Sequence, residues 1–242
     1  MGIAECFASA AASYDQHAQL QRRIGQRLLA AAKPAPLWLD LGAGTGFISA
    51  QLPAKQVIAL DLALPMLMQG RISGRFEQAL CADIGALPLR DDCIDAMAAN
   101  LSMQWCPDLT QALVELGRVI RADGQLLFTL PIAGCFIELD ALVAQRTLGC
   151  NRCPEVGQIE QALAHSGWCG KLQEVTERMY FDSAKALLRH FKATGAHYHR
   201  EHQGGLKGRR WWRQVEAELE RFRQPEGIPL TWKLLLVEAV RA

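Results

Sequence analysis

Short apolar runs alternate with helix-like segments from residue 37 to residue 130. The apolar runs predict strands at 37–41, 56–60, 76–81, 93–99 and 125–130, and the segments between them predict helices at 47–52, 65–72 and 109–120. In the last of these helices Leu109, Leu113, Leu116 and Ile120 recur at helical spacing, and Asp123-Gly124 follows as a turn. Strands that alternate with helices indicate βαβ units and a parallel sheet covered on both faces.

The flanking segments extend this pattern to both ends of the chain. Residues 3–32 look helical, further helices are predicted at 136–148 and 155–164, and strands at 172–181 and 231–240. About fifty residues separate the last two strands, far more than the few residues of a hairpin loop. We expect one α/β domain over 1–242, with a doubly wound, mostly parallel, seven-stranded sheet. Its parts are N-terminal helices (1–34), a core (37–181), a helical insertion (183–228) and a closing strand (229–242).

Composition places the chain among globular proteins. It has 242 residues, of which 50% are hydrophobic and 21% charged, enough for a substantial core and too apolar for disorder. No uncharged apolar run approaches the ~20 residues that span a bilayer, and the first residues lack a signal-peptide pattern. The eight cysteines mostly stand alone, and only Cys150 and Cys153 form a C-x-x-C. We therefore expect a cytoplasmic protein without a metal site or a membrane partner.

Charge is concentrated in the insertion. The whole chain has a formal net charge of +1, whereas residues 183–223 carry ten Lys and Arg against four acids. Within it, residues 207–213 mix basic and aromatic side chains, which fits nucleic acid, an acidic protein partner or a helix that packs its tryptophans inward. His197, His199 and His202 could bind zinc, but no fixed scaffold supports that interpretation.

The strongest chemical signal is the run Leu-Asp-Leu-Gly-Ala-Gly-Thr-Gly at residues 39–46, where the first strand ends. Glycines let the backbone turn tightly and let a ligand approach, and ligands bind at the carboxyl ends of parallel strands. The spacing is not the G-x-G-x-x-G of a dinucleotide fold, and Asp40 disfavours a pyrophosphate there. The pattern therefore favours a turn that binds a cationic or hydroxyl-rich ligand over a turn that only connects a strand to a helix.

Polar residues also end the next three predicted strands. Asp61 ends the second and can accept hydrogen bonds from two ribose hydroxyls, although it can also cap a helix. Asp83 ends the third, where a carboxylate can accept from an exocyclic amine while Ile84 stacks on the ring. Asn100-Leu101 ends the fourth, where the reacting end of a ligand would lie. Because these strand ends meet at one edge of the sheet, we predict a single site.

Together these residues resemble the class I S-adenosylmethionine-dependent methyltransferases over residues 37–130. The family's D-x-G-x-G-x-G is matched by Asp40 to Gly46, its ribose-binding acid by Asp61 and its adenine-side acid by Asp83. The resemblance implies a Rossmann-like fold with S-adenosylmethionine as co-substrate. It implies cofactor-binding residues at Asp40, Gly42, Gly44, Gly46, Asp61, Leu62, Asp83, Ile84, Asn100 and Leu101.

A narrower resemblance covers most of the chain. The fourth strand ends Asn-Leu-Ser-Met, not in the N/D-P-P-Y/F of amino-methylating nucleic-acid methyltransferases. Residues 7–18 with Gln21, and segments 61–67, 101–106, 195–197 and 229–232, resemble the malonyl-acyl carrier protein methyltransferases of biotin synthesis. That family implies transfer of a methyl group to the free carboxyl of a malonyl thioester, with an acyl carrier protein as partner and no nucleic acid. The 1–34 helices then form a lid, and 37–181 binds the cofactor.

A malonyl carboxylate is already ionised at neutral pH, so its methylation needs no general base, only a cation or hydroxyl that holds it. We expect Tyr14 and Arg200 as the catalytic pair, with Arg189 as the second choice of cation. The plain alternatives are a packing role for Tyr14 and a solvated charge for Arg200. Because carrier proteins are acidic, the basic cluster is best explained by such a partner. Substrate or partner contacts are expected at Gln104, Trp105, Arg189, Lys207, Arg209 and Arg210.

Two other functions fit parts of the sequence. A methyltransferase acting on a quinone or aromatic precursor would share the Asp40–Gly46 run but would need neither Tyr14 nor a basic insertion. A non-catalytic or RNA-binding protein that retains the cofactor fold would explain the insertion alone. Carrier-protein and coenzyme A thioesters both remain open as the acceptor.

Overall fold

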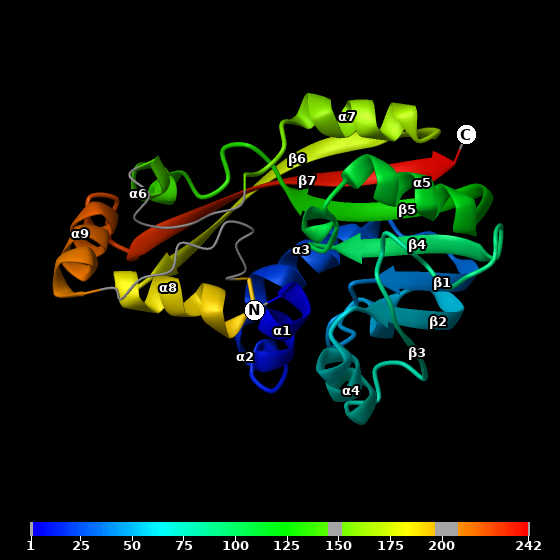
Figure 1. Ribbon diagram of the computed structural model, residues 1–242, viewed down its shortest axis with the longest axis horizontal. Coiled ribbons are helices and arrows are strands. Elements are labelled where there is room, and N and C mark those ends of the chain that lie inside the picture. The colour runs from blue at the N-terminus through cyan, green and yellow to red at the C-terminus, as the bar shows by residue number, and fades with distance from the viewer. Residues whose placement is uncertain (1, 145–151, 197–207, 242) are drawn as a thin grey trace.

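A seven-stranded sheet forms the centre of the protein (Figure 1), whose computed structural model describes residues 2–144, 152–196 and 208–241. The strand order is β3-β2-β1-β4-β5-β7-β6. The strands are β1 (Ala35–Leu41), β2 (Ala54–Asp61), β3 (Gln78–Cys81), β4 (Ile94–Asn100), β5 (Ile120–Pro131), β6 (Trp168–Phe181) and β7 (Ile228–Arg241). β1 to β5 are parallel, and β7 runs antiparallel to both β5 and β6. The mostly parallel sheet predicted from the sequence is confirmed.

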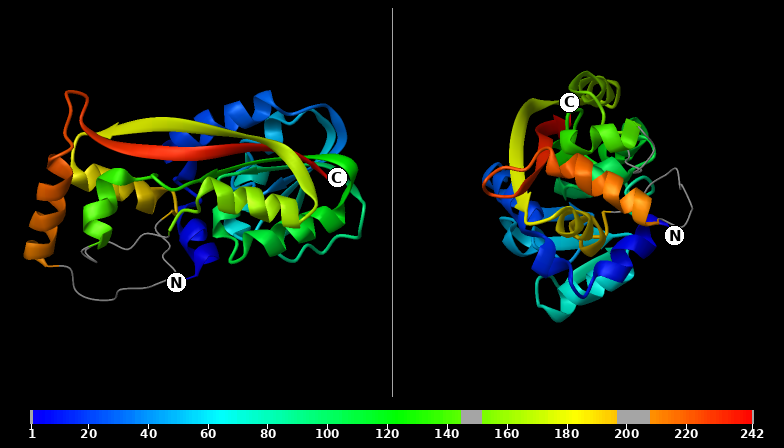
Figure 2. Two further views of the ribbon diagram at one scale, coloured as in Figure 1. Left: turned by 90° about the horizontal axis from the view of Figure 1, so that it is seen from above. Right: turned by 90° about the vertical axis from the view of Figure 1, so that its left-hand side faces the viewer.

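Helices cover both faces of this sheet. They are α1 (Ile3–Ala10), α2 (Tyr14–His17), α3 (Gln19–Ala30), α4 (Leu64–Ile72), α5 (Leu109–Val119), α6 (Asp140–Ala144), α7 (Val156–His165), α8 (Ala184–Ala193) and α9 (Arg209–Glu220). α5 and α7 lie on one face of the sheet and α3 on the other (Figure 2). Within the described ranges, no helix is long and apolar enough to cross a membrane.

The first strand is buried on both faces from Trp38 to Leu41. Leu39 and Leu41 pack in the cluster that contains Leu116 of α5, whereas Trp38 packs with Leu28 of α3 on the opposite face. Successive side chains of a strand point to opposite faces, so a strand between two helical layers has no face left for water. β1 is thereby fixed at the centre of the sheet, and its carboxyl end opens directly into the glycine-rich turn.

The N-terminal region that the sequence predicts to be helical over residues 3–32 consists of several helices. It divides into α1, α2 and α3 because its parts pack on different surfaces. Phe7 and Ala11 of the first part contact Met66 of α4, whereas Leu28 of α3 lies against the sheet. One straight helix cannot reach both surfaces, and the chain turns at residues 11–13 and at Ala18.

Two boundaries differ from the prediction. The helix expected at 47–52 is reduced to a 3₁₀ turn at Ser49–Gln51, because Leu52 precedes Pro53 and adopts the extended conformation that such residues prefer. β5 begins at Ile120, five residues before the predicted start, with Asp123 in a left-handed conformation inside it. The other predicted strands and helices have counterparts within a few residues of their expected positions, except that the end of the helix predicted at 136–148 lies outside the described residues.

The last two strands extend well beyond the rest of the sheet. β7 pairs with β5 only from Leu234 to Val240, so residues 228–233 pair with β6 alone. An isolated two-stranded ribbon is at best marginally stable in water. Here it is stabilised by a second apolar cluster, in which Leu230 and Trp232 of β7 meet Leu187 of α8 and Leu219 of α9. The ribbon extends past the carboxyl ends of the parallel strands, and α8 and α9 pack along this extension (Figure 1).

A buried carboxylate anchors this ribbon to the loop after β5. Glu138 is only 2% exposed, and its Oε2 and Oε1 accept hydrogen bonds from the Thr231 amide (3.0 Å) and hydroxyl (2.6 Å). A buried charge is tolerated only when hydrogen bonds replace its hydration. The neighbouring Phe136 has a left-handed backbone, and its amide donates to the Thr231 carbonyl at 2.7 Å. These bonds hold the loop against β7.

We predict that Thr231→Val lowers the free energy of unfolding by about 1.5–3 kcal/mol, since the near-isosteric change removes one donor from a buried carboxylate. Urea unfolding at neutral pH measures the effect. Thr176→Val is the matched control, because Thr176 is exposed on β6. Equal stabilities of the two variants would show that the Thr231 hydroxyl contributes nothing to Glu138.

Candidate functional site

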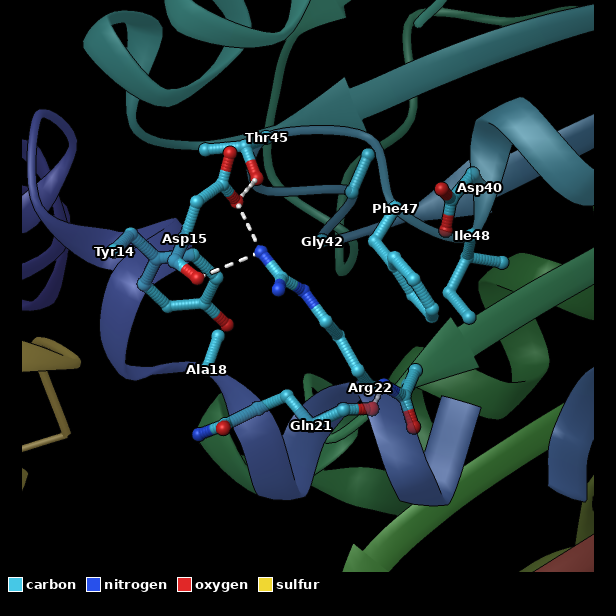
Figure 3. Close-up of a pocket in the computed structure, with 12 residues that line it drawn as sticks. Tyr14, Asp15, Ala18, Gln21, Arg22, Asp40, Gly42, Thr45, Phe47 and Ile48 are labelled. Atoms are coloured by element: carbon cyan, nitrogen blue, oxygen red, sulfur yellow. Dashed lines mark hydrogen bonds and ion pairs between the residues drawn. The ribbon is translucent and has the colours of Figure 1, made fainter. Parts of the chain in front are cut away.

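A cavity lies where the carboxyl ends of β1 and β4 meet the N-terminal helices. It is lined by Tyr14, Asp15, Ala18, Gln21, Arg22, Asp40, Gly42, Ala43, Thr45, Phe47, Ile48 and Asn100 (Figure 3). Its volume of about 30 Å³ holds only a water molecule or two. A nucleoside does not fit in this volume with the N-terminal helices in their present position. That these helices act as a lid stays a prediction.

The floor of the cavity is the glycine-rich turn after β1. Gly42, Gly44 and Gly46 have φ values of +66°, +55° and +84°, in the left-handed region that glycine adopts without strain. A Cβ atom at Gly42 would lie 2.4 Å from Cβ of Ser102, and one at Gly46 would lie 2.6 Å from the Phe76 ring. The turn thus needs glycine both for its conformation and for its close packing.

Asp61 at the end of β2 fixes the shape of this turn. Its Oδ2 accepts from the Gly44 amide at 2.8 Å, and its Oδ1 accepts from the Ala63 amide at 2.8 Å. Burial raises the pKa of Asp61, although the amide hydrogen bonds oppose that shift. Each carboxylate oxygen has a further lone pair, so the group can hold the loop and still accept from ligand hydroxyls.

Asp40 lies beneath the turn and is almost completely buried. Its side chain is 1% exposed, and its Oδ2 accepts from the Ser49 hydroxyl at 2.5 Å. Burial raises its pKa to about 7, although the Ser49 hydrogen bonds oppose the shift, and the nearby Asp61 carboxylate adds to it. Asp40 is therefore partly protonated at neutral pH. A cationic ligand in the cavity would favour its charged form.

The residues predicted on the adenine side lie outside this cavity. Asp83 is exposed beyond β3, and its Oδ1 accepts from the Gly85 amide at 2.8 Å. Leu62 is 43% exposed after β2, and Ile84 is half-buried. The structure thus places them at the neighbouring strand ends, on the open side of the turn. Their role in binding a nucleoside stays a prediction.

Asn100 connects the end of β4 to the lid. Its Nδ2 donates to the Gln21 carbonyl at 2.8 Å, while its Oδ1 accepts from the Thr129 hydroxyl at 2.9 Å. Leu101 follows with a left-handed φ of +53°, and its amide donates to Thr129. Because both ends of the Asn100 amide are occupied, its orientation is fixed. The structure therefore brings Asn100 to the cavity and Leu101 directly after it.

Tyr14, at the start of α2, stands above the glycine turn. A Cβ atom at Gly44 would lie 4.0 Å from its ring, and its hydroxyl forms no hydrogen bond with any described residue. Burial and the nearby Asp61 and Asp15 carboxylates raise its pKa above the ordinary value, so the phenol keeps its proton at neutral pH. The structure thus places a protonated hydroxyl at the cavity, and its catalytic role stays a prediction.

Asp15 is a residue whose role the sequence does not reveal. Its Oδ1 accepts from the Thr45 hydroxyl at 2.7 Å, and its Oδ2 accepts from Nη2 of Arg75 at 2.7 Å. Burial opposes ionisation, but these hydrogen bonds outweigh it and lower the pKa of Asp15. The charged side chain thus latches α2 to the glycine turn. Tyr14-Asp15 falls within the N-terminal resemblance, which is the one sequence signal that includes it.

Arg22 of α3 extends across the same cavity (Figure 3). Its Nη2 donates to the Asp15 carbonyl at 2.6 Å, and its guanidinium lies 5.8 Å from the centroid of the Phe47 ring. In the sequence Arg22 is one of two adjacent arginines on a polar stretch, and no motif distinguishes it. Among the described residues, Arg22 lines the cavity and Arg189 does not, whereas Arg200 lies outside the described ranges.

The predicted partner contacts are distributed over a wider surface. Gln104 donates to the Leu101 carbonyl at 2.8 Å, and Trp105 meets Phe7 of α1 edge-on at 5.6 Å, so both lie beside the site or its lid. Arg189 is exposed on α8, while Arg209 and Arg210 are exposed at the start of α9, and none of the three lines the cavity. Arg200 and Lys207 lie outside the described residues.

A metal site is the remaining candidate chemistry. Over residues 2–144, 152–196 and 208–241, no group of three His, Cys, Asp or Glu side chains is placed to hold an ion. His197, His199 and His202, which the sequence singles out, lie outside these ranges. None of the seven described cysteines forms a disulfide.

Comparison with known families and proteins gives consistent results. Residues 39–128 match a family described as a methyltransferase domain. Malonyl-acyl carrier protein O-methyltransferase of Alcanivorax borkumensis is 36% identical, with 99% of this chain and 86% of the relative covered. The enzyme of that name from Erwinia pyrifoliae is 37% identical over 96% of this chain and 90% of its own. The biotin biosynthesis bifunctional protein BioHC of Cellvibrio japonicus is 35% identical over 96% of this chain but 48% of its own length.

Solved structures share the fold at low sequence identity. A putative methyltransferase from Bacillus halodurans has a TM-score of 0.67 at 16% identity, with 90% of this chain and 98% of that chain covered. A Haemonchus contortus phosphoethanolamine N-methyltransferase in complex with S-adenosylhomocysteine has a TM-score of 0.58 at 14% identity, over 97% of this chain and 57% of its own. These similarities establish the class I methyltransferase fold.

The raised pKa of Asp40 predicts an unusual pH dependence. Because its pKa rises from 3.8 in the unfolded chain to about 7 in the fold, its contribution to stability is complete below pH 4 and is lost as the pH rises through 7. Relative to Asp40→Asn, the wild-type free energy of unfolding should fall by a few kcal/mol between pH 4 and 7.5, at about 1.4 kcal/mol per pKa unit. Urea unfolding across this range measures the difference. Parallel pH profiles would contradict the shift.

Proposed function

The chain belongs to the malonyl-acyl carrier protein O-methyltransferase family, and we propose that it transfers a methyl group from S-adenosylmethionine to the free carboxyl of a malonyl thioester. The observation that carries the proposal is the family relationship over nearly the whole chain, together with a cavity that combines Asp40, Tyr14 and Arg22 above the glycine turn. The product is a methyl ester, formed early in biotin synthesis, to which the bifunctional relative's name also refers.

The chain's own residues fit the cofactor. When bound, S-adenosylmethionine supplies a methyl group on a cationic sulfur. Asp61 would accept the ribose hydroxyls, and Asp83 the adenine amine, with Leu62 and Ile84 against the ring. The glycine turn would allow the backbone to approach the ligand closely. Gln21 Oε1, a buried acceptor without a hydrogen bond among the described residues, and the Asp40 carboxylate would face its cationic amino group.

The transfer itself needs alignment rather than acid–base chemistry. A carboxylate oxygen attacks the methyl carbon, and the electron pair of the carbon–sulfur bond returns to sulfur, which becomes neutral. No proton is taken up or released, so no general base is required. The protein has to hold oxygen, carbon and sulfur in line and exclude water. The lid helices, latched by Asp15, perform both tasks when they close.

Tyr14 is the group we place on the acceptor carboxylate. It is protonated, its hydroxyl has no partner among the described residues, and its ring lies over the turn. A neutral donor orients a carboxylate without suppressing its nucleophilicity as strongly as a close ion pair would. A cation at Arg200 or Arg189 remains part of the proposal. Arg189 is exposed on α8, which packs near α2, and Arg200 lies outside the described residues.

The alternative functions are not favoured. Relatives that share one function match at 36–37% identity over 96–99% of the chain, which includes the N-terminal pattern and the insertion. A methyltransferase acting on a quinone would explain only the core, and a retained fold that binds RNA would explain only the insertion. We propose no metal in the reaction, since the carboxylate is ionised without one. A reducing, cytoplasmic location fits seven described cysteines without a disulfide.

The proposal is tested by incubating the purified protein with isotopically labelled S-adenosylmethionine and malonyl carrier protein. We expect a labelled methyl ester on the malonyl group, detected by mass spectrometry of the intact carrier. Malonyl-coenzyme A in place of the carrier protein distinguishes the two thioesters. Addition of a chelator should leave the rate unchanged. Label on a nitrogen, a phenol or RNA instead of the ester would refute the assignment.

Tyr14→Phe should leave the fold and the affinity for S-adenosylhomocysteine intact and slow methyl transfer. Loss of one positioning hydrogen bond corresponds to about 0.5–1.5 kcal/mol for a neutral donor, and more if the carboxylate depends on it. Single-turnover kinetics gives the rate, and calorimetry gives the affinity. Tyr180→Phe is the matched control, because Tyr180 is exposed on β6 far along the ribbon. A wild-type rate in Tyr14→Phe would limit Tyr14 to packing.

Carrier-protein docking is the second part of the proposal. Arg221 and Arg223 near the end of α9 pair with Glu218 and Glu220 three residues earlier. By contrast, Arg209, Arg210 and Arg213 at its beginning form no ion pair with a described acid. The excess positive charge of this helix is therefore concentrated at its first turns. An acidic carrier protein would be attracted to that end.

We predict that the double variant Arg209→Ser, Arg210→Ser lowers the association rate of the carrier protein and weakens its salt dependence. Its rate with a small malonyl thioester should stay unchanged. The matched control is Arg221→Ser, Arg223→Ser, which removes two cations just beyond the end of α9 that pair with acids of that helix. Stopped-flow binding at several ionic strengths distinguishes the variants. Equal effects of the two pairs would exclude a specific docking site at the start of α9.

A further inference from the structure

Two adjacent arginines on α3 have opposite surroundings. Arg23 points to the outside, where its Nη1 lies 3.7 Å from Oε2 of Glu177 on β6. Arg22 lines the cavity and extends between the lid and the glycine turn (Figure 3). Two neighbouring residues of one helix cannot face the same way, and the packing of Ile24 and Leu28 decides which of them faces inward. Arg22 is thereby held in the site.

The charge of Arg22 is only partly compensated in the fold. The nearest carboxylate is Asp15, whose Oδ1 lies 3.5 Å from Nη2 of Arg22. That carboxylate already accepts two hydrogen bonds from Arg75, at 2.7 and 3.1 Å, and one from Thr45. The short bond of Arg22 goes instead to the neutral Asp15 carbonyl, at 2.6 Å. Two arginines thus share one carboxylate, and a positive charge remains at the cavity.

The cavity therefore has both kinds of group that an amino acid zwitterion requires. The Arg22 guanidinium and the Phe47 ring line it, and so do the Asp40 carboxylate and Gln21, whose buried Oε1 has no hydrogen bond among the described residues. The proposed ribose and adenine contacts, Asp61 and Asp83, lie at neighbouring strand ends and outside this cavity. The cavity beside Arg22 is thus left for the amino acid part of the cofactor.

We propose that Arg22 binds the carboxylate of the methionyl part of S-adenosylmethionine, and that this contact closes the lid over the bound cofactor. The inference rests on the proposed function to the extent that the ligand is S-adenosylmethionine. Arg22 of α3 donates to the Asp15 carbonyl of α2, next to Tyr14, so a ligand that holds Arg22 in the cavity also keeps the Tyr14 hydroxyl over the turn. Cofactor binding then prepares the acceptor site.

The test compares ligands that differ in the amino acid part. Calorimetry measures binding of S-adenosylhomocysteine, its decarboxylated analogue and methylthioadenosine to the wild type, Arg22→Met and Arg23→Met. We expect Arg22→Met to weaken S-adenosylhomocysteine binding about 10- to 100-fold, as expected for a charged hydrogen bond, and to change binding of the two carboxylate-free ligands less than twofold. Arg23→Met should resemble the wild type with all three ligands.

Each other outcome has a definite meaning. Equal losses for all three ligands in Arg22→Met would assign Arg22 a structural role and overturn the inference. Unchanged binding of S-adenosylhomocysteine would overturn it as well. Failure of the wild type to bind any of the three would instead refute the proposed function. If Arg22→Met does not fold, Arg22→Lys retains the charge and should keep a preference for the carboxylate-bearing ligand.

Lid closure has a readout that needs no catalysis. In the wild type, S-adenosylhomocysteine should slow amide hydrogen exchange across residues 3–30 more than methylthioadenosine does at matched saturation. In Arg22→Met this difference should disappear, while Arg23→Met should retain it. Equal protection by both ligands in the wild type would show that the nucleoside alone closes the lid, which overturns the coupling between Arg22 and closure.

Discussion

The hydrogen bond from the Gly44 amide to the Asp61 carboxylate is the contact on which the site depends. It joins the ends of β1 and β2 and holds the glycines of the turn in left-handed conformations that other residues adopt only with strain. The same turn places the Thr45 hydroxyl where it donates to the Asp15 carboxylate. The position of the lid therefore follows from the shape of the loop. Without this bond, the cofactor surface and the docking point of the lid would both be lost.

The N-terminal helices are held by polar contacts at the strand ends and by the apolar packing of Leu20, Ile24 and Leu28 of α3. Asp15 with Thr45 and Arg75, and Asn100 with the Gln21 carbonyl, connect α2 and α3 to the strand ends, while the apolar contact of α1 with α4 is small. Polar contacts near a surface can be exchanged for water at little net cost. An enzyme that must admit a nucleoside and then exclude water needs such a lid. The same helices carry the groups that we place on both substrates.

The β6–β7 ribbon and the helices beside it, where we place the docking of the carrier protein, are held by apolar packing. The β6–β7 ribbon projects beyond the sheet and is stabilised by an apolar cluster that it shares with α6, α8 and α9. This cluster also includes Leu20 and Ile24 of α3, so the ribbon and the lid share a packed surface. A carrier protein bound at the start of α9 would then be linked to the lid by a continuous apolar core. In the proposed function, the insertion and the cofactor site would therefore act together.

The sequence by itself determined the alternation of strands and helices, the glycine turn and the acids at the strand ends. These features depend on local spacing and on backbone conformations that few residues adopt, so they can be read without knowing what packs against what. Tertiary structure alone decided that Arg22 faces the cavity while Arg23 faces outward, that Asp15 latches the lid, and that residues 3–32 divide into three helices. Those outcomes depend on which surfaces the helices meet across the fold. A charged residue on a polar helix stretch has the same local pattern whether it ends in a cavity or in solvent, because the difference is made only by packing.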